Sequence, residues 1–188
     1  MQIPTDDEIR ALHERFAPSR AAFELVWTHC RIVCELAEEL FVEGDLVLVR
    51  AGSLLHDIGV YRLQPADNYV RHGILGHELL RDVGLPEALC RFCSHHTGVG
   101  ITRADVLDQG LPLPAEDFLA ETAEEELVMY ADKFHSKTSP PRFLTADTYA
   151  AKVGRFGAGK VEHFAELRKQ YGEPDLAGAA QRYGHTVI

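Results

Sequence analysis

The stretch Ser53–Arg62, SLLHDIGVYR, closes an apolar run with His56 and Asp57 and continues at once with isoleucine and glycine. The residues before it are apolar almost all round a helix, and this pattern predicts a helix buried at the centre of the protein. An imidazole beside a carboxylate at the end of such a helix has two interpretations. The pair is a local cap favoured by the helix dipole, or it binds a ligand. The rest of the chain has to decide between them.

Helical periodicity continues on both sides of this stretch. Apolar residues recur at three- and four-residue steps, and helix starts are marked by the capping boxes Thr5-x-x-Glu8 and Thr122-x-x-Glu125. Glycine, proline, aspartate and asparagine predict a loop over 58–70. The predicted helices cover residues 5–15, 19–43, 45–57, 71–83, 86–96, 102–107, 122–137, 145–153, 160–171 and 173–183. No segment has the clear alternation that predicts a strand.

This pattern predicts an all-α, single-domain helical bundle over residues 1–188, a length that can bury a core without staples. We expect the main body at about 19–137. A C-terminal helical appendage at about 145–188 would serve as a lid, a packing arm or an oligomer contact. The apolar content of the C-terminal helices is compatible with a homodimer.

Composition and charge restrict the possible functions. The formal net charge of −10 argues against sequence-independent binding to nucleic acid, which requires a basic surface. The chain has no apolar run of membrane-spanning length and no signal-peptide pattern at its start, so a cytoplasmic protein is expected. Disulfides are not expected in that compartment. The four cysteines form two closely spaced pairs, Cys30/Cys34 and Cys90/Cys93. The pairs read either as small buried hydrophobes or as a four-sulfur zinc site.

Histidines and aspartates near helix breaks or on apolar helix faces are the candidate ligands. Each of them alone can be explained without a ligand, as a hydrogen-bonded core residue or as a surface residue near a helix end. Together they supply imidazole nitrogen and carboxylate oxygen, the ligand types that suit Fe, Mn, Ni or Zn. Helical bundles can build such sites from inward-facing side chains. The candidates are His29, His56, Asp57, His72, His77, His95, His96 and Asp132.

The order of these motifs resembles the HD-domain metal-dependent phosphohydrolases. His29, the pair in LLHDIG, and Asp132 in YADK are similar to that family's upstream histidine, His-Asp pair and distal aspartate. The resemblance covers roughly 19–137 and implies that this region is the metal-binding core. RHGILGHELL and HHTGVG resemble the two segments of members that carry extra histidines. In that register His72 and His96 are the ligands, His95 is less suitable, and His77 falls at a small-residue position.

This resemblance implies the dinuclear branch of the family. Asp57 would bridge two ions, one completed by His29, His56 and Asp132 and the other by His72 and His96. The four-ligand branch would hold a single ion and leave the extra histidines to contact substrate. The implied cofactor is therefore one or two divalent ions of Fe, Mn, Ni or Zn. After HDIG many relatives carry lysine, where this chain has Val60.

The implied reaction is phosphate-ester hydrolysis by metal-activated water, with Asp57 at its centre and a small, nucleotide-like phosphorylated substrate. Arg62, Arg71 and Lys133 are candidates for the cations around the phosphate, each with a solvated surface residue as its alternative. Two other functions stay open. The first is a mixed-valence di-iron oxygenase with the same ligands, since metals and second-shell groups decide between the reactions. The second is a nucleotide-sensing binding module.

Overall fold

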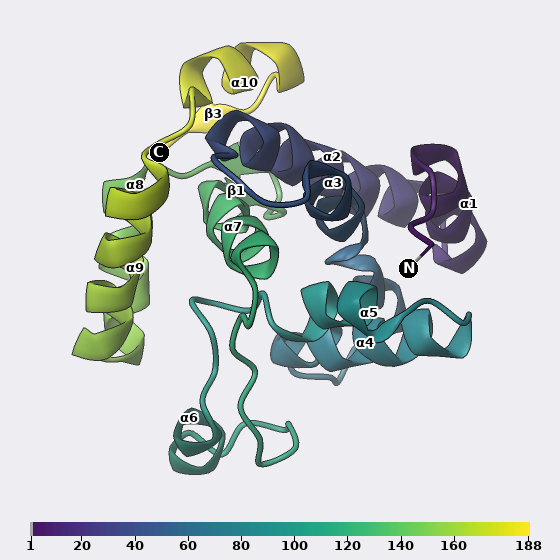
Figure 1. Cartoon of the computed structure of the whole chain (residues 1–188), viewed down its shortest axis with the longest axis horizontal. Coiled ribbons are helices and arrows are strands. Elements are labelled where there is room, and N and C mark those ends of the chain that lie inside the picture. The colour runs from purple at the N-terminus through teal and green to yellow at the C-terminus, as the bar shows by residue number, and fades with distance from the viewer. Residues whose placement is uncertain (1) are drawn as a thin grey trace.

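The fold is built around helix α3 (Leu46–Leu55), whose last turn is buried as its apolar sequence predicts. The computed structural model describes residues 2–188 (Figure 1). Asp45 caps α3 by accepting hydrogen bonds from the backbone N–H groups of residues 47 and 48, at 3.0 and 3.1 Å. The helix packs against α2 (Arg20–Leu40), α5 (Glu87–Ser94) and α7 (Ala123–Ala131). These contacts place the His56-Asp57 pair inside the protein.

The remaining helices surround this centre, and the all-α class is confirmed. Helix α4 (His72–Asp82) lies beside α5, and α8 (Ala146–Val153) lies beside α9 (Ala158–Tyr171) on another flank (Figure 1). The other α-helices are α1 (Asp6–Phe16), α6 (Arg103–Asp108) and α10 (Leu176–Tyr183). Short 3₁₀ turns are η1 (Ile58–Arg62), η2 (Tyr69–Arg71), η3 (Asp132–Phe134) and η4 (Gly154–Phe156).

A small sheet of three two-residue strands was not predicted. Its strands are β1 (His135–Ser136), β2 (Arg142–Phe143) and β3 (Thr186–Val187). β2 lies in the middle, antiparallel to β1 and parallel to β3. Strands this short are too brief for a period-two pattern to be recognised in the sequence. The sheet fastens the end of the chain beside the segment that follows α7.

The prediction of one helix over 122–137 was wrong at its C-terminal end. Helix α7 stops at Ala131, η3 follows, and the backbone is extended at His135. At the other end, the Thr122 hydroxyl accepts a hydrogen bond from the Glu125 N–H at 3.2 Å, as the capping box predicts. The Glu125 carboxylate instead accepts two hydrogen bonds from Arg91, at 2.7 and 3.1 Å. The early end of α7 turns the residues after Asp132 toward the protein interior.

Gly59 is required by close packing and not by its backbone conformation. Its φ angle is not among the positive values found in the described residues, so no left-handed conformation requires glycine there. A Cβ atom at Gly59 would lie 2.0 Å from the His72 carbonyl oxygen and 2.2 Å from the Gly76 backbone nitrogen. The absence of a side chain lets η1 pack directly on α4. This close approach brings the start of α4 next to the His56-Asp57 pair.

Within residues 2–188 no helix is both long enough and apolar enough to span a bilayer. All four cysteines are free and buried, and the Cys93 thiol donates to the Leu55 carbonyl at 3.4 Å. The groups of potential metal ligands in this part of the chain consist of histidines and aspartates. The cysteines therefore have the packing role that their helical positions suggest.

A buried histidine in α1 makes fold stability depend on pH. His13 lies between the Leu54 carbonyl, 2.8 Å from Nε2, and the Tyr61 hydroxyl, 2.9 Å from Nδ1. Burial lowers the pKa of His13 to about 4 from an ordinary value of 6.5. The unfolded chain therefore binds a proton near pH 6.5 that the folded protein does not bind until about pH 4. The stabilisation is complete above pH 6.5 and is lost as the pH falls toward 4.

We expect this single site to cost about 3 kcal/mol of unfolding free energy across that window. The His13→Gln variant keeps a donor and an acceptor but cannot titrate. Denaturant unfolding of chelator-treated protein at pH 7.5 and pH 4.5 measures the effect. Between pH 7.5 and pH 4.5 the free energy of unfolding should fall by about 2–3 kcal/mol more in wild type than in His13→Gln. Equal losses in the two proteins would contradict the buried, neutral state of His13.

Candidate metal centre

Six predicted ligands from five parts of the chain meet at one buried cluster. His29 comes from the middle of α2, His56 and Asp57 from the end of α3, and the others from the termini of α4, α5 and α7. Helix ends bring these side chains together because the backbone turns there. The six residues, which we call the His/Asp cluster, are His29, His56, Asp57, His72, His96 and Asp132.

Three histidines of the cluster are held by the same kind of contact. The Nδ1 atoms of His56, His72 and His96 lie 2.7, 2.6 and 2.7 Å from the backbone carbonyls of residues 53, 69 and 93. A carbonyl only accepts hydrogen bonds, so each Nδ1 carries the proton. Each Nε2 therefore presents its lone pair to the centre of the cluster. This is the arrangement by which proteins fix the tautomer of a metal-binding imidazole.

Asp57 lies between two pairs of imidazoles. Its Oδ2 is 3.1 Å from Nε2 of His29 and 3.5 Å from Nε2 of His56. Its Oδ1 is 3.4 Å from Nε2 of His72 and 3.7 Å from Nε2 of His96. The two carboxylate oxygens thus face different histidine pairs. Such a carboxylate can bridge two cations.

Asp132 closes the His29–His56 side of the cluster. Its Oδ1 lies 3.0 Å from Nε2 of His29 and 3.6 Å from Nε2 of His56. Its Oδ2 accepts a hydrogen bond from Lys133 Nζ at 2.6 Å, and the same ammonium donates to the His96 carbonyl at 2.9 Å. Burial alone would raise the pKa of Asp132, but Lys133 and His29 hold it well below its usual range.

Two features of the cluster are unfavourable without a bound cation: facing imidazole lone pairs and a buried carboxylate oxygen that accepts no hydrogen bond. The Nε2 atoms of His72 and His96 are 3.0 Å apart although both Nδ1 atoms carry the protons, so two lone pairs face each other. Two ligands about 2.1 Å from one ion at a right angle have this separation. Among residues 2–188, Asp57 Oδ1 is buried without a hydrogen-bond donor. Imidazole and carboxylate ligands of this kind suit first-row transition ions.

A chain of two further histidines extends from the cluster toward the C-terminus. His29 Nδ1 lies 2.8 Å from His135 Nδ1, and His135 Nε2 lies 3.0 Å from His185 Nδ1. If His29 presents the Nε2 lone pair to the cluster, its Nδ1–H donates to His135, which in turn donates to His185. His135 follows η3 and His185 precedes β3. The small sheet therefore positions the outer partners of His29.

Burial and nearby charges set the ionisation of the cluster. Burial lowers the pKa of His96 well below its ordinary value and that of His72 in the same direction, so both are neutral ligands at pH 7. Burial alone would raise the pKa of Asp57, but Lys137 and His56 hold it well below its usual range. Burial likewise opposes the charge on Lys137, yet contact with Asp57 raises its pKa. The centre thus combines the neutral imidazoles of His72 and His96 with carboxylates and ammonium groups.

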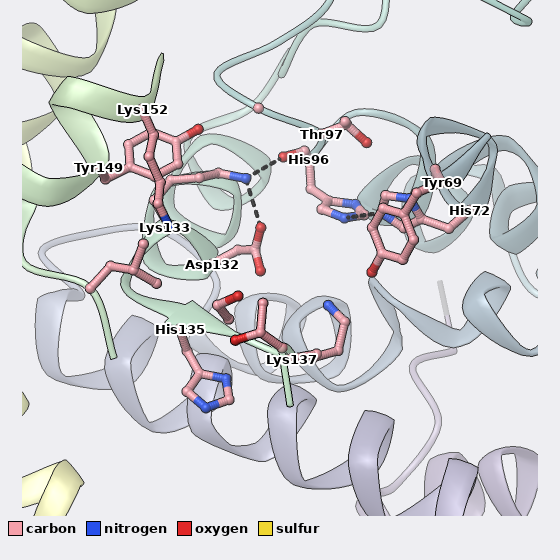
Figure 2. Close-up of a pocket in the computed structure, with 14 residues that line it drawn as sticks. Tyr69, His72, His96, Thr97, Asp132, Lys133, His135, Lys137, Tyr149 and Lys152 are labelled. Carbon is pink, nitrogen blue, oxygen red and sulfur yellow. Dashed lines mark hydrogen bonds and ion pairs between the residues drawn. The ribbon is translucent and has the colours of Figure 1, made fainter. Parts of the chain in front are cut away.

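A cavity of about 430 Å³ opens onto the cluster. His72, His96 and Asp132 form part of its wall (Figure 2). In Figure 2, Tyr149 and Lys152 of α8 lie on the side opposite Tyr69. Three lysines line the cavity: Lys133, Lys137 and Lys152. Lys133 pairs with Asp132 and Lys137 with Asp57, whereas Lys152 forms no ion pair with a described carboxylate.

Of the three cations predicted to surround the phosphate, the structure places one at the cavity and two elsewhere. Lys133 lines the cavity, whereas Arg62 and Arg71 are not among the lining residues. Arg62 pairs with Asp82 at 3.1 Å, and Arg71 pairs with Asp67 at 2.8 Å. These arginines have the surface roles that were their alternative interpretation.

His95 and His77 lie outside the cluster. His95 Nδ1 is 2.6 Å from the Ser94 hydroxyl, and His77 Nδ1 is 2.9 Å from the same oxygen. His77 Nε2 also lies 3.3 Å from the Glu87 carboxylate. Both imidazoles therefore belong to a polar group around Ser94, and His96 is the member of the adjacent histidine pair that reaches the cluster.

Several cavity residues were missed by sequence reasoning. His135 and Lys137 lie two and four residues after YADK, but a helix was predicted there. The chain is extended at His135 instead of helical, and all four residues of the segment 135–138 line the cavity. Tyr149 and Lys152 come from the appendage, which packs over the cavity. No motif marks them, because their position depends on how α8 docks.

Comparison with known proteins identifies related chains. A model described as HD domain matches residues 26–137. An uncharacterised protein of Methanocaldococcus jannaschii is 40% identical over 116 residues, which cover 58% of this chain and 65% of that protein. A tRNA (cytidine(56)-2'-O)-methyltransferase of Picrophilus torridus is 34% identical over 136 residues, covering 71% of this chain and 37% of that protein. The chain thus spans less than two thirds of the length of these curated relatives.

Two solved structures have the same fold. The HD domain of the L. monocytogenes phosphodiesterase PgpH matches with a TM-score of 0.51 and 14% identity, covering 93% of this chain and 98% of that one. The same domain in complex with cyclic-di-AMP matches with a TM-score of 0.53 and 14% identity, covering 94% of this chain and 97% of that one. At this identity the likeness concerns the helical architecture.

Proposed function

Because the chain belongs to the HD-domain family, we propose that it is a metal-dependent phosphohydrolase that acts on a small phosphate ester. The observation that carries this proposal is the position of Asp57 between two imidazole pairs, next to a cavity lined by three lysines. A cationic cavity beside a transition-metal site suits a phosphoryl group, which needs both a Lewis acid and counter-charges.

We assign the ligands to two ions. His29, His56 and Asp132 would hold one, His72 and His96 the other, and Asp57 would bridge them. The orphaned Asp57 Oδ1 and the facing Nε2 lone pairs support this assignment. Divalent Fe, Mn, Ni or Zn bound there supplies a Lewis acid for the phosphoryl oxygens and a water of lowered pKa.

The chain's own residues bind and orient the phosphate. Lys133 and Lys137 stand at Asp132 and Asp57 and can donate to oxygens of an ester in the cavity. Lys152 approaches from α8, where burial and then Arg142 lower its pKa, and its ammonium can donate to the phosphate. The Tyr149 hydroxyl adds a neutral donor from the same helix. These groups replace water around the phosphate with fixed donors.

The appendage belongs to the functional unit in this proposal. Residues 1–188 would form one HD-like domain, with a metal-binding core at about 19–137. The appendage at about 145–188 would complete the cavity, because α8 supplies Tyr149 and Lys152. The lysine-lined cavity favours a phosphate ester over the substrate of a di-iron oxygenase. The complete ligand set favours an enzyme over a binding module.

The test is metal analysis combined with phosphate release. Protein purified without chelator should contain about one to two transition ions per chain. It should release phosphate from members of a panel of nucleotides and phosphomonoesters. Chelation should abolish that release, and Fe, Mn, Ni or Zn should restore it. Protein that retains no transition metal, or that releases no phosphate with any of the four metals, would contradict the proposal. A mixed-valence iron EPR signal that changes on substrate addition under air would indicate the oxygenase.

A further inference from the structure

A second cavity adjoins the lysine-lined one and differs from it in chemistry. Its volume is about 350 Å³, within the range of small-molecule sites. The two cavities share Tyr69, Thr97 and Gly98, so they adjoin along this edge. Apolar side chains from 70–111 and from the α8–η4 segment form most of its wall: Val70, Val99, Ile101, Leu111, Val153 and Phe156.

The second cavity has no free cation among its lining residues. Its charged residues are Asp105 and Lys160, whose carboxylate oxygen and ammonium nitrogen lie 2.6 Å apart. Lys160 Nζ also donates to the Gly100 carbonyl at 2.8 Å. This pair is neutral as a unit, whereas the neighbouring cavity holds Lys152, which forms no ion pair with a described carboxylate, beside the paired Lys133 and Lys137. A second phosphate would find no counter-charge here, so the cavity suits an uncharged group.

Two aromatic rings line the second cavity and remain half exposed. The relative exposure of Tyr69 is 51% and that of Phe156 is 57%. Tyr69 lies at the junction with the first cavity, where its ring is 4.5 Å from the ring of His72. Phe156 belongs to η4, and because its side chain is exposed, packing in the hydrophobic core does not explain its position. Exposed rings of this kind stack on planar groups, and the amides of Asn68 and Gln109 can pair with polar ring edges.

From these observations we infer that the second cavity binds the leaving group of the substrate, and that this group carries an uncharged planar ring. The substrate class is then a ring-bearing phosphomonoester, such as a nucleoside monophosphate or an aryl phosphate. The phosphate lies among the lysines at the His/Asp cluster, and the ring stacks between Tyr69 and Phe156. This inference rests on the proposed hydrolase function for the position of the phosphate. The appendage then determines specificity through Phe156.

The activity test compares three esters in the metal-loaded protein: adenosine monophosphate, phenyl phosphate and glycerol phosphate. We expect kcat/KM for the ring-bearing esters to exceed that for glycerol phosphate by about tenfold or more. In Phe156→Ala that ratio should fall about tenfold. Leu107→Ala removes a comparably exposed apolar side chain that does not line the cavity and should leave the ratio unchanged. A preference for adenosine monophosphate over phenyl phosphate would identify the ring as a nucleobase.

Binding provides a readout that does not depend on hydrolysis. Saturation-transfer NMR with adenosine, which has no phosphate, should give a signal with wild type and with Leu107→Ala that is lost in Phe156→Ala. No transfer to adenosine in wild type, or equal transfer in Phe156→Ala, would overturn the ring site. A ratio near one for wild type would also overturn it. If no ester is hydrolysed but adenosine binds through Phe156, the hydrolase proposal fails and the ring site stands.

Discussion

The Asp57→Ala variant is expected to lose both bound metal and activity. Asp57 is the residue whose two oxygens face both histidine pairs, so its removal takes one ligand from each proposed ion. It also leaves the Lys137 ammonium, now paired with Asp57, next to four imidazoles. Loss of a residue that hydrogen-bonds a metal ligand lowers metal affinity or activity by about 10–100-fold. Loss of a ligand shared by both proposed ions should therefore lower phosphate release by at least about 10³-fold. Metal content should fall below about a tenth of the wild-type value.

Three further variants make this result specific. Asp57→Asn keeps the side-chain volume and should also lose metal, which separates the effect of charge from that of a cavity. Asp82→Ala removes an exposed aspartate that pairs with Arg62 and should behave as wild type. His135→Phe leaves all six proposed ligands but removes the partner of His29, and should weaken metal binding about 10–100-fold. Metal analysis, phosphate release and circular dichroism are measured on each. A folded Asp57→Ala protein with wild-type metal content would refute the assignment.

The second large effect is expected at Gly59. A Cβ atom there would lie 2.0 Å from the His72 carbonyl oxygen, 2.2 Å from the Gly76 nitrogen and 2.6 Å from the Gly76 Cα atom. All three obstacles are backbone atoms, so no side chain can rotate away. Overpacking costs about 1–3 kcal/mol where side chains can adjust, and a backbone clash should reach about 3–5 kcal/mol. That loss is a large part of the ~5–15 kcal/mol that stabilises an ordinary domain.

Denaturant unfolding of Gly59→Ala measures this loss. Gly159→Ala is the matched control, because it makes the same change inside α9 with no heavy atom within 4 Å of the added Cβ. That control should be neutral or more stable by up to about 1 kcal/mol, the helix preference for alanine over glycine. Gly59→Ala should also bind metal more weakly, since any relief of the clash moves the start of α4 and His72 with it. Equal stability of the two variants would show that η1 and α4 are not in this close contact.

The helical class and most helices could be predicted because their signals are local. Apolar spacing, capping residues and glycine breaks act within a few residues of one another, as at Asp45 and Thr122. Errors occurred where a tertiary contact competes with a local preference. Glu125 pairs with Arg91 instead of closing its capping box, and α7 ends six residues before Lys137. The two-residue strands form because the chain end docks there, which no local pattern encodes.

The residues of the His/Asp cluster could be predicted from the sequence, whereas of the three predicted cations only Lys133 lines the cavity. Histidine and aspartate in the order His29, His56-Asp57, Asp132 form a recognisable motif, and the structure brings these four residues together with two of the other four candidates, His72 and His96. Lysine and arginine occur on every protein surface, so their residue type carries little information about position. Arg62 and Arg71 are close in sequence to the cluster but pair with surface carboxylates. Lys137 and Lys152 are farther from the motif pair and reach the cavity.

The sequence by itself determined the helices, the buried α3 and the identity of the candidate metal ligands, because each depends on residue type and local spacing. Only the tertiary structure decided why Gly59 must be small, which cations face the ligands, and that α8 and η4 wall the cavities. Those features depend on atoms that are far apart along the chain and meet only after packing. His56 and Asp57 are therefore more than a helix cap, but the two residues do not form a site without the other members of the His/Asp cluster. They become part of a candidate metal centre because α2, α4, α5 and α7 place their own candidate ligands around the end of α3.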